Sequence, residues 1–251
     1  MPSKEEKKLE LMRKACEITA GALKVIKPYI NAGISTAHLD KLLEQYIIDC
    51  GAIPSFKGYQ GFPNSACISV NEMVVHGIPS DKIILKEGDI VSIDVGAKYK
   101  GYNGDAARTF TVGKVSAEKE KLIKVTKECF FEGIKNLKAG VRVGVISNAV
   151  QLHAEKNGFS VVRELVGHAV GEELHEDPQI PNFGEKNEGP VIAKGSFLAI
   201  EPMINAGRPD VRMLRDGWGI ITADKRPSAH YENTVLVTES GVEILTGVGD
   251  E

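Results

Sequence analysis

The side chains that could do chemistry in this sequence are four carboxylates and one imidazole, each in or beside a short apolar run: Asp94, Asp105, His168, Glu201 and Glu232. Apolar runs of this kind are typical of buried β-strands, where a carboxylate is costly unless it is protonated, paired or bound to a cation. Two divalent cations would carry four positive charges and would balance four carboxylates. The set therefore predicts an oxygen-rich site for two metal ions, and such sites usually catalyse hydrolysis.

Asp94 and Asp105 lie on two segments, 89–95 and 105–112, which predict a β-hairpin. Because side chains alternate between the two faces of a strand, Asp94 faces away from its apolar neighbours. A turn centred between residues 99 and 100 would place the two carboxylates directly opposite each other, which is destabilising unless something binds between them. A plainer interpretation is that both aspartates are exposed strand residues. For Asp105 alone this interpretation would be the stronger one, but for the pair it is the weaker.

His168 and His175 fall in segment 166–178, where we expect a strand to turn into a loop. Glu201 lies inside an apolar strand-like segment, and Glu232 opens another. Alone, each has a plainer explanation, as a surface histidine or as a glutamate at a sheet edge. Together with the aspartate pair they favour a shared metal site, although the spacing does not match the His-Glu-x-x-His motif of helical zinc peptidases.

The composition is that of a folded domain without a strong preference for nucleic acid. The 251 residues carry a net charge of -3, so no basic imbalance indicates direct nucleic-acid recognition. The charged first residues lack the apolar core of a secretory signal, and no apolar stretch approaches the ~20 residues that cross a bilayer. The four scattered cysteines form no Cys-x-x-Cys pair, which favours reduced thiols and a cytoplasmic location.

Hydrophobic periodicity predicts helices followed by strands, twice over. We expect helices at 4–27, from Ser35 or Thr36 to Gly51, at 116–139 and at 143–156, and strand-like segments at 65–75, 89–95, 105–112, 161–166, 197–204 and 230–246. No low-complexity linker divides the chain, so we expect one α+β domain over residues 1–251. The repeated order suggests two similar halves, roughly 1–113 and 114–251, although no sequence repeat is visible.

Five segments, in this order, closely resemble the type I methionine aminopeptidases: NSACISVNEMVVHGIP, SIDVGAKYKGYNGDAARTF, VGHAVGEELHEDP, AIEPMI and AHYENTVLVT. The resemblance covers nearly the whole chain. It implies the pita-bread fold, a curved antiparallel sheet covered by helices in two pseudo-symmetric halves. It also implies a metalloaminopeptidase that removes the initiator methionine from nascent polypeptides when the next residue is small.

The resemblance assigns the metal ligands. Asp94 resembles the chelating ligand of one ion, Asp105 and Glu232 the bridging carboxylates, and His168 and Glu201 the ligands of the other ion. A hydroxide held by both ions would then attack the methionine carbonyl. Carboxylate-rich ligands suit Co, Mn, Fe, Ni or Zn, and the sequence does not choose among these metals.

Two histidines and one glutamate carry the remaining chemistry that the resemblance implies. Glu201 would take the proton of the attacking water and pass it to the leaving amine. His76 and His175 match the family's two non-ligand histidines, which contact the substrate. His175 would donate to the developing oxyanion, and His76 would act near the scissile nitrogen.

An apolar slot for the methionine side chain is also implied, lined by Tyr59, Phe62, Cys67, Leu174 and Trp218. Phe62 and Leu174 replace the tyrosine and phenylalanine that family members often carry, so the resemblance does not set the size of the slot. Each of these residues could also be ordinary core. A further implied site is a monovalent cation held by backbone oxygens near Asn71, Met73 and Ser228.

Two other function classes are weighed against this hypothesis. Proline-specific aminopeptidases and dipeptidases share the fold but usually carry a large N-terminal domain, whereas residues 1–75 predict only two helices. A non-catalytic binding relative would typically have lost ligands, and all five positions are intact. The stretch 176–201 leaves no room for the helical insertion of type II enzymes. We expect a monomer, with the Lys/Glu-rich residues 4–14 a candidate ribosome contact, although a solvated helix face is the better interpretation of that run.

Overall fold

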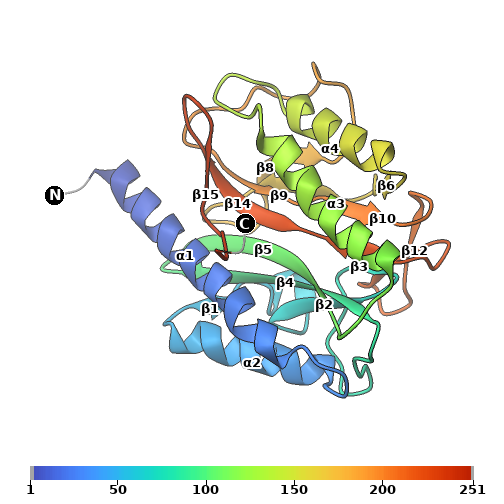
Figure 1. Ribbon diagram of the computed structural model, residues 1–251. Helices are drawn as coiled ribbons and strands as arrows, with labels where there is room; N and C mark the ends of the chain where they lie inside the picture. The colour runs from blue at the N-terminus through green and yellow to red at the C-terminus, as the bar shows by residue number, and fades with distance from the viewer. Residues whose placement is uncertain (1–2, 250–251) are drawn as a thin grey trace.

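The computed structural model describes residues 3–249, and its centre is one large antiparallel sheet (Figure 1). The strand order is β1-β4-β5-β14-β9-β7-β8, with β2 paired to β4 and β15 paired to β14. The strands of this sheet are β1 Ile53–Pro54, β2 Ala66–Val70, β4 Ile90–Tyr99, β5 Tyr102–Thr111, β7 Val166–Ala169, β8 Glu176–Pro181, β9 Phe197–Ile200, β14 Glu232–Val237 and β15 Val242–Ile244.

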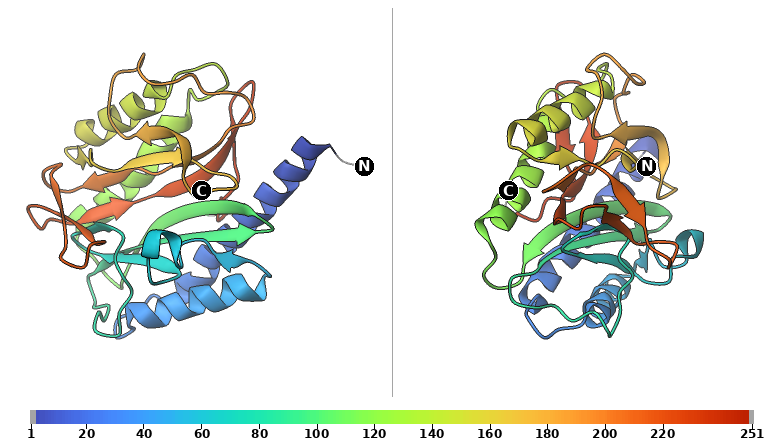
Figure 2. Two further views of the ribbon diagram at one scale, coloured as in Figure 1. Left: turned by 180° about the vertical axis from the view of Figure 1, so that it is seen from behind. Right: turned by 90° about the vertical axis from the view of Figure 1, so that its right-hand side faces the viewer.

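Two three-stranded sheets flank the large one, in the orders β13-β10-β6 and β11-β12-β3. Their strands are β3 Met73–Val75, β6 Ser160–Val161, β10 Met203–Asn205, β11 Val211–Met213, β12 Ile220–Thr222 and β13 Ser228–His230. The helices are α1 Lys4–Ile26, η1 Lys27–Tyr29, α2 Thr36–Asp49, η2 Tyr59–Gly61, α3 Ala117–Ile134 and α4 Gly144–Lys156. In the view from behind, strands of the large sheet lie in front of α3 (Figure 2).

Serines begin three of the predicted helices by accepting a hydrogen bond from a free backbone N–H of the first turn. Ser3 caps α1 as part of a capping box with Glu6, Ser35 caps α2, and Ser116 caps α3. The helices expected at 4–27, after Ser35 or Thr36, and at 143–156 are confirmed. The helix expected at 116–139 is α3, and it ends earlier, at Ile134.

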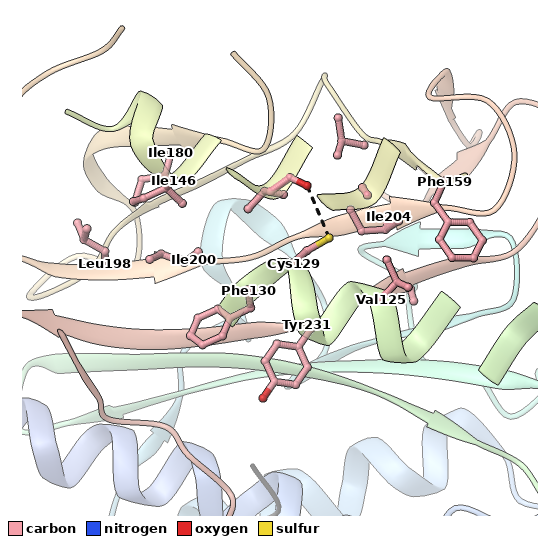
Figure 3. Packing of buried hydrophobic residues seen from close by; sticks show 14 of the residues in the cluster. Val125, Cys129, Phe130, Ile146, Phe159, Ile180, Leu198, Ile200, Ile204 and Tyr231 are labelled. Atoms are coloured by element: carbon pink, nitrogen blue, oxygen red, sulfur yellow. Dashed lines mark hydrogen bonds between the residues drawn. The ribbon is translucent and has the colours of Figure 1, made fainter. Parts of the chain in front are cut away.

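Each half of the chain has its own apolar core. Residues between Ile18 and Val112 join α1 and α2 to one side of β4 and β5. A second core joins α3 and α4 to strands of the second half, around Phe130, Cys129 and Tyr231 (Figure 3). This division agrees with the order of helices then strands in each half. The predicted symmetry between the halves stays a prediction.

The alternation predicted for the hairpin holds, but its register differs from the one expected. The apolar neighbours of Asp94 face the core with α1 and α2, and Asp94 faces the other way. Tyr99 pairs with Tyr102, so Asp94 lies opposite Ala107 and not opposite Asp105. Both central residues of the turn, Lys100 and Gly101, have positive φ, which is the backbone of a tight two-residue hairpin. The two carboxylates are therefore diagonal neighbours on one face.

Four expected strand-like segments are interrupted, and several short strands were not expected. The segment 65–75 divides into β2 and β3, 161–166 falls between β6 and β7, 197–204 divides into β9 and β10, and 230–246 divides into β14 and β15. Pro202 explains the break between β9 and β10, because proline has no N–H to continue a ladder. Glu201 therefore follows the end of β9 instead of lying within a strand. The unexpected strands are β1, β8, β11, β12 and β13.

Within residues 3–249, no helix is both long enough and apolar enough to cross a membrane.

Candidate active site and metal centre

A cavity of about 500 Å³ opens on the face of the sheet away from α1 and α2. It is lined by every residue predicted for the metal site, for substrate contact and for the slot: Asp94, Asp105, His168, Glu201, Glu232, His76, His175, Tyr59, Phe62, Cys67, Leu174 and Trp218. The sheet brings these residues together from segments that are far apart in the sequence.

The strand register sets most of the acidic cluster. Asp94 of β4 and Glu232 of β14 both lie opposite Ala107 of β5, in one row across three strands. Asp105 is two residues from Ala107 on the same face of β5. The residue between the two acidic ones, Ala107, contributes only a methyl group.

The tightest group of ligand atoms comes from Asp105, His168 and Glu232, with one atom of each lying within 4.8 Å of the others. Glu201 joins them, since its Oε1 is 3.5 Å from His168 Nε2. Asp105, His168 and Glu232 are buried, and the Glu201 side chain is only 13% exposed. Asp94 lies outside the three-residue group and completes the cavity wall from β4.

The Nε2 atom of His168 directs its lone pair towards the carboxylates of Asp105 and Glu201. His168 Nδ1 is 3.0 Å from the carbonyl oxygen of Ala169, to which it donates, so in the neutral ring Nε2 carries no proton. Nε2 then faces Asp105 Oδ2 at 3.8 Å and Glu201 Oε1 at 3.5 Å. Facing acceptors repel one another unless a cation lies between them. Metal-bound histidines commonly donate their other ring N–H to a backbone carbonyl, which fixes the imidazole tautomer.

Three buried carboxylate oxygens make no hydrogen bond among the described residues: Asp94 Oδ1, Asp105 Oδ1 and Glu232 Oε1. Burial raises the pKa of Asp94 to about 7 and that of Glu201 to about 8. Burial, reinforced by neighbouring carboxylates, raises the pKa values of Asp105 and Glu232 well above their ordinary range. A buried polar atom without a partner is costly, so this donor set fits divalent cations.

Burial also keeps the histidines neutral. It lowers the pKa of His168 to about 3, with the neighbouring charge of His175 as a smaller cause, and the pKa of His76 to about 4. The pKa of His175 is lowered for the same reason. A neutral imidazole can ligate a metal or donate one hydrogen bond.

His76 and His175 approach the cluster from two different loops. His76 directly follows β3, and its φ of 58° lies in the left-handed region, which a non-glycine side chain adopts at a cost of about 1 kcal/mol or more. His175 lies on the exposed loop before β8, with its ring edge-on to His168 at 4.2 Å between centroids. Backbone strain of this kind is common at functional sites.

The slot residues form a separate small apolar cluster beside the acidic one. Phe62, Cys67 and Leu174 are buried, and the rings of Phe62 and Trp218 meet edge to face at 5.1 Å. Cys67 pairs with Asp94 across β2 and β4, so the slot adjoins the metal-type ligands. Burial raises the pKa of the Cys67 thiol, which keeps this wall uncharged.

Sequence reasoning missed three residues around the site. Phe56 is a buried member of the slot cluster. His230 is fully buried, neither of its ring nitrogens makes a hydrogen bond among the described residues, and its Nε2 is 3.4 Å from Glu201 Oε2. Arg108 lies on the opposite face of β5 and donates to the backbone carbonyls of Ala107 and Glu232. The sequence signal for His230 was its place two residues before Glu232.

The comparisons with known proteins identify the class. The model of metallopeptidase family M24 matches residues 10–239, and the chain belongs to this family. Over 245 residues the chain is 50% identical to methionine aminopeptidase 1 of Bacillus subtilis (strain 168), covering 98% of each protein. A crystal structure of methionine aminopeptidase from Thermotoga maritima has a TM-score of 0.94 at 45% identity, covering 96% of each chain.

A prolidase from Pyrococcus furiosus shares the fold more distantly, with a TM-score of 0.79 and 26% identity. That match covers 98% of this chain but 65% of the prolidase. The fold is therefore the pita-bread fold of the M24 metallopeptidases, as the resemblance implied, and the chain is a metal-dependent peptidase.

Proposed function

We propose that this chain removes the initiator methionine from the free N-termini of nascent polypeptides whose second residue is small. The observation that carries the proposal is His168 Nε2 facing Asp105 and Glu201 beside unpartnered carboxylate oxygens, in a cavity that also contains an apolar slot. A single cavity thus offers ligands for cations and a pocket for an uncharged side chain. These are the two features that methionine removal by a metallopeptidase requires.

The proposed ligands are Asp94, Asp105, His168, Glu201 and Glu232, holding two divalent ions between them. When bound, the ions supply Lewis-acid activation of water and of the substrate carbonyl, and a ligand position for the free α-amino group. Mn, Fe, Co, Ni and Zn all suit carboxylate and imidazole donors, so supply in the cell would select among them.

The side chains of the cavity perform the proton transfers and the alignment. Glu201 takes the proton of the attacking water and delivers it to the leaving nitrogen, a task open to a carboxylate that lines the cavity beside His168. His175 donates to the carbonyl oxygen as negative charge develops there. His76 acts near the scissile amide nitrogen. All three residues line the cavity, which supports the roles that the resemblance implies.

Selection of methionine is assigned to the slot formed by Tyr59, Phe62, Cys67, Leu174 and Trp218. An unbranched thioether adapts well to such an irregular apolar space, and sulfur makes favourable contacts with aromatic rings. The slot offers two aromatic rings in edge-to-face contact and no charged group among its own members. A charged first residue would lose its hydration there without a partner.

The proposal extends to the surroundings of the enzyme. We expect a cytoplasmic monomer whose substrates are nascent N-termini, with a monovalent cation near Asn71, Met73 and Ser228. Ser228 N donates to Asn71 O at 2.9 Å, so two of these segments are adjacent. The first turns of α1 are exposed, which suits a solvated face and leaves ribosome contact as a separate prediction.

The test is a peptide series given to metal-free protein supplied with Mn, Fe or Co. Met-Ala-Ser should lose its methionine, and an N-acetylated copy should stay intact because its blocked amine can no longer act as a ligand. Activity on X-Pro peptides without activity on Met-Ala-Ser would assign the chain to the proline-specific class. No turnover of either peptide with any metal would favour a binding function.

A further inference from the structure

A hydrogen bond across the mouth of the cavity joins the two halves of the chain. The Tyr59 hydroxyl lies 2.9 Å from Nδ1 of His175, and the two rings meet edge to face at 5.1 Å between centroids. Tyr59 begins η2 in the connection between β1 and β2, and His175 comes from the loop between β7 and β8. The contact is therefore not a local consequence of chain connectivity.

The backbone on the Tyr59 side is held by its own hydrogen bonds. Gly58 N donates to Phe62 O at 2.8 Å, and Phe62 N donates to Tyr59 O at 2.9 Å. Gly58 and Gln60 have positive φ, which closes this loop tightly around the tyrosine. The hydroxyl is thereby presented from a fixed frame.

The backbone on the His175 side is anchored to the end of the β4–β5 hairpin. Asn103 donates through its side-chain amide to the carbonyls of Gly171 and Glu172, both at 3.0 Å, and Lys98 Nζ donates to the carbonyl of Glu172 at 2.9 Å. With both loops anchored, the remaining freedom of His175 is the rotation and tautomer of its ring. The contact with Tyr59 restricts both.

The direction of this hydrogen bond decides which ring nitrogen carries the proton. Among residues 3–249 the Tyr59 hydroxyl has no acceptor other than His175 Nδ1. A phenol is a stronger donor than a neutral imidazole, and its oxygen is the weaker acceptor of the two. Donation from Tyr59 to Nδ1 therefore leaves the proton of a neutral ring on Nε2.

We infer that Tyr59 is a positioning residue, whose hydroxyl holds His175 in the Nε2–H tautomer with that N–H directed to the substrate carbonyl oxygen. The inference rests on the proposed function, in which His175 donates to that oxygen. It gives Tyr59 a role beyond lining the slot. The opposite tautomer would place a lone pair against the developing negative charge.

The direct test is nitrogen NMR of the zinc-loaded protein labelled with ¹⁵N in its histidines. Zinc is diamagnetic, and the His175 resonances can be assigned from a His175→Ala sample. We expect Nε2 to be protonated in the unsubstituted protein and the two tautomers to be mixed in Tyr59→Phe. A ring protonated on Nδ1, or a tautomer unchanged in Tyr59→Phe, would overturn the inference.

Kinetics give a second readout that a packing role would not reproduce. Because phenylalanine keeps the ring in the slot, Tyr59→Phe should lower kcat about tenfold, the size of one lost neutral hydrogen bond, while KM changes less than about twofold. Tyr102→Phe is the matched control. It removes a hydroxyl that donates to Glu172 in the same loop without contacting His175, and kcat should stay within about twofold.

A double-mutant cycle separates positioning from packing. In the His175→Ala background, Tyr59→Phe should have no further effect on kcat, because the ring that it positions is absent. Additive losses would overturn the inference. Since the NMR tautomer does not depend on turnover, an inactive unsubstituted protein with the Nε2–H tautomer would count against the proposed function and not against the positioning of His175.

Discussion

Asp94 and Glu232 lie in the same cross-strand row, one on each side of Ala107. Ala107 is fully buried. Its methyl group is the smallest side chain of any residue other than glycine. The row therefore contains two carboxylates on the strands to either side of Ala107, and both line the cavity. A larger side chain at position 107 would project between them. The space between these two carboxylates is where we expect the cations to lie.

Filling that space is the first prediction. Ala107→Val should weaken divalent-metal affinity by about 10- to 100-fold, the range seen when groups around a metal site are disturbed. The measurement is isothermal titration calorimetry with Mn²⁺. Ala106→Val is the control, because Ala106 faces the core with α1 and α2. It should lower the free energy of unfolding by about 1–3 kcal/mol through overpacking and leave metal affinity unchanged. Equal metal affinity in Ala107→Val and the unsubstituted protein would contradict the expected position of the ions.

The second prediction concerns the pH dependence of stability in the metal-free protein. Raised pKa values mean that the folded chain keeps protons on its buried carboxyls that the unfolded chain has released, from pH about 4 up to about 8 for Glu201. The lowered pKa values of the buried histidines act in the opposite sense, but only below their ordinary value of 6.5. Above pH 6.5 the carboxyls dominate, and the buried Cys67 thiol, whose pKa is also raised, acts in the same direction as the pH approaches 9.0, so stability should fall as the pH rises.

The measurement is the thermal midpoint, with a chelator present, between about pH 6.5 and pH 8.5. We expect the midpoint to decrease across this window. Saturating Mn²⁺ should raise the midpoint at every pH and remove the decrease, because bound cations neutralise the carboxylates. A midpoint of the chelated protein that rises with pH would show that the four carboxyls are not titrating together in one buried cluster.

Glu201→Gln is the third prediction. The amide keeps the shape of the side chain but cannot carry a proton between water and leaving group, so kcat on Met-Ala-Ser should fall by about 10²–10⁴-fold while the fold survives. Circular dichroism checks the fold. Glu173→Gln, an exposed change of the same chemistry outside the cavity lining, should be close to neutral. Retained activity in Glu201→Gln would refute the proton-transfer role.

His230 provides the fourth prediction. Its Nε2 is 3.4 Å from Glu201 Oε2, and burial lowers its pKa, so a neutral N–H is available to steady that carboxylate. His230→Leu should lower kcat about tenfold, and His230→Gln, which retains an N–H donor, should recover most of the loss. If leucine and glutamine variants turned over alike, His230 would be only a packing residue.

Much of the fold could be predicted because periodicity and capping residues are local signals. Ser35 and Ser116 begin helices where the sequence indicates, and the facing of Asp94 follows from simple alternation. The hairpin register could not be predicted in the same way. The register depends on whether Lys100 adopts positive φ beside Gly101. Because the turn lies one position later than expected, the cross-strand partner of Asp94 is Ala107 and not Asp105.

The site shows the same division between local and long-range information. Residue type and apolar context identify Glu201 and Glu232 as candidates, since a carboxylate in an apolar run needs an explanation. The contact of His230 with Glu201 depends on how β13 and β10 pair, and the bond from Tyr59 to His175 depends on two anchored loops. No spacing in the sequence encodes these contacts, because they arise only when the sheet is assembled.

The most direct test of the central claim is an anomalous-scattering map of crystals of the Mn²⁺-loaded protein. We predict two peaks in the cavity, both within ligand distance of Asp105 and Glu232, one also contacting Asp94 and the other contacting His168 and Glu201. No peak in this cavity, or peaks only at sites away from these five side chains, would contradict the claim that they form a shared two-metal centre.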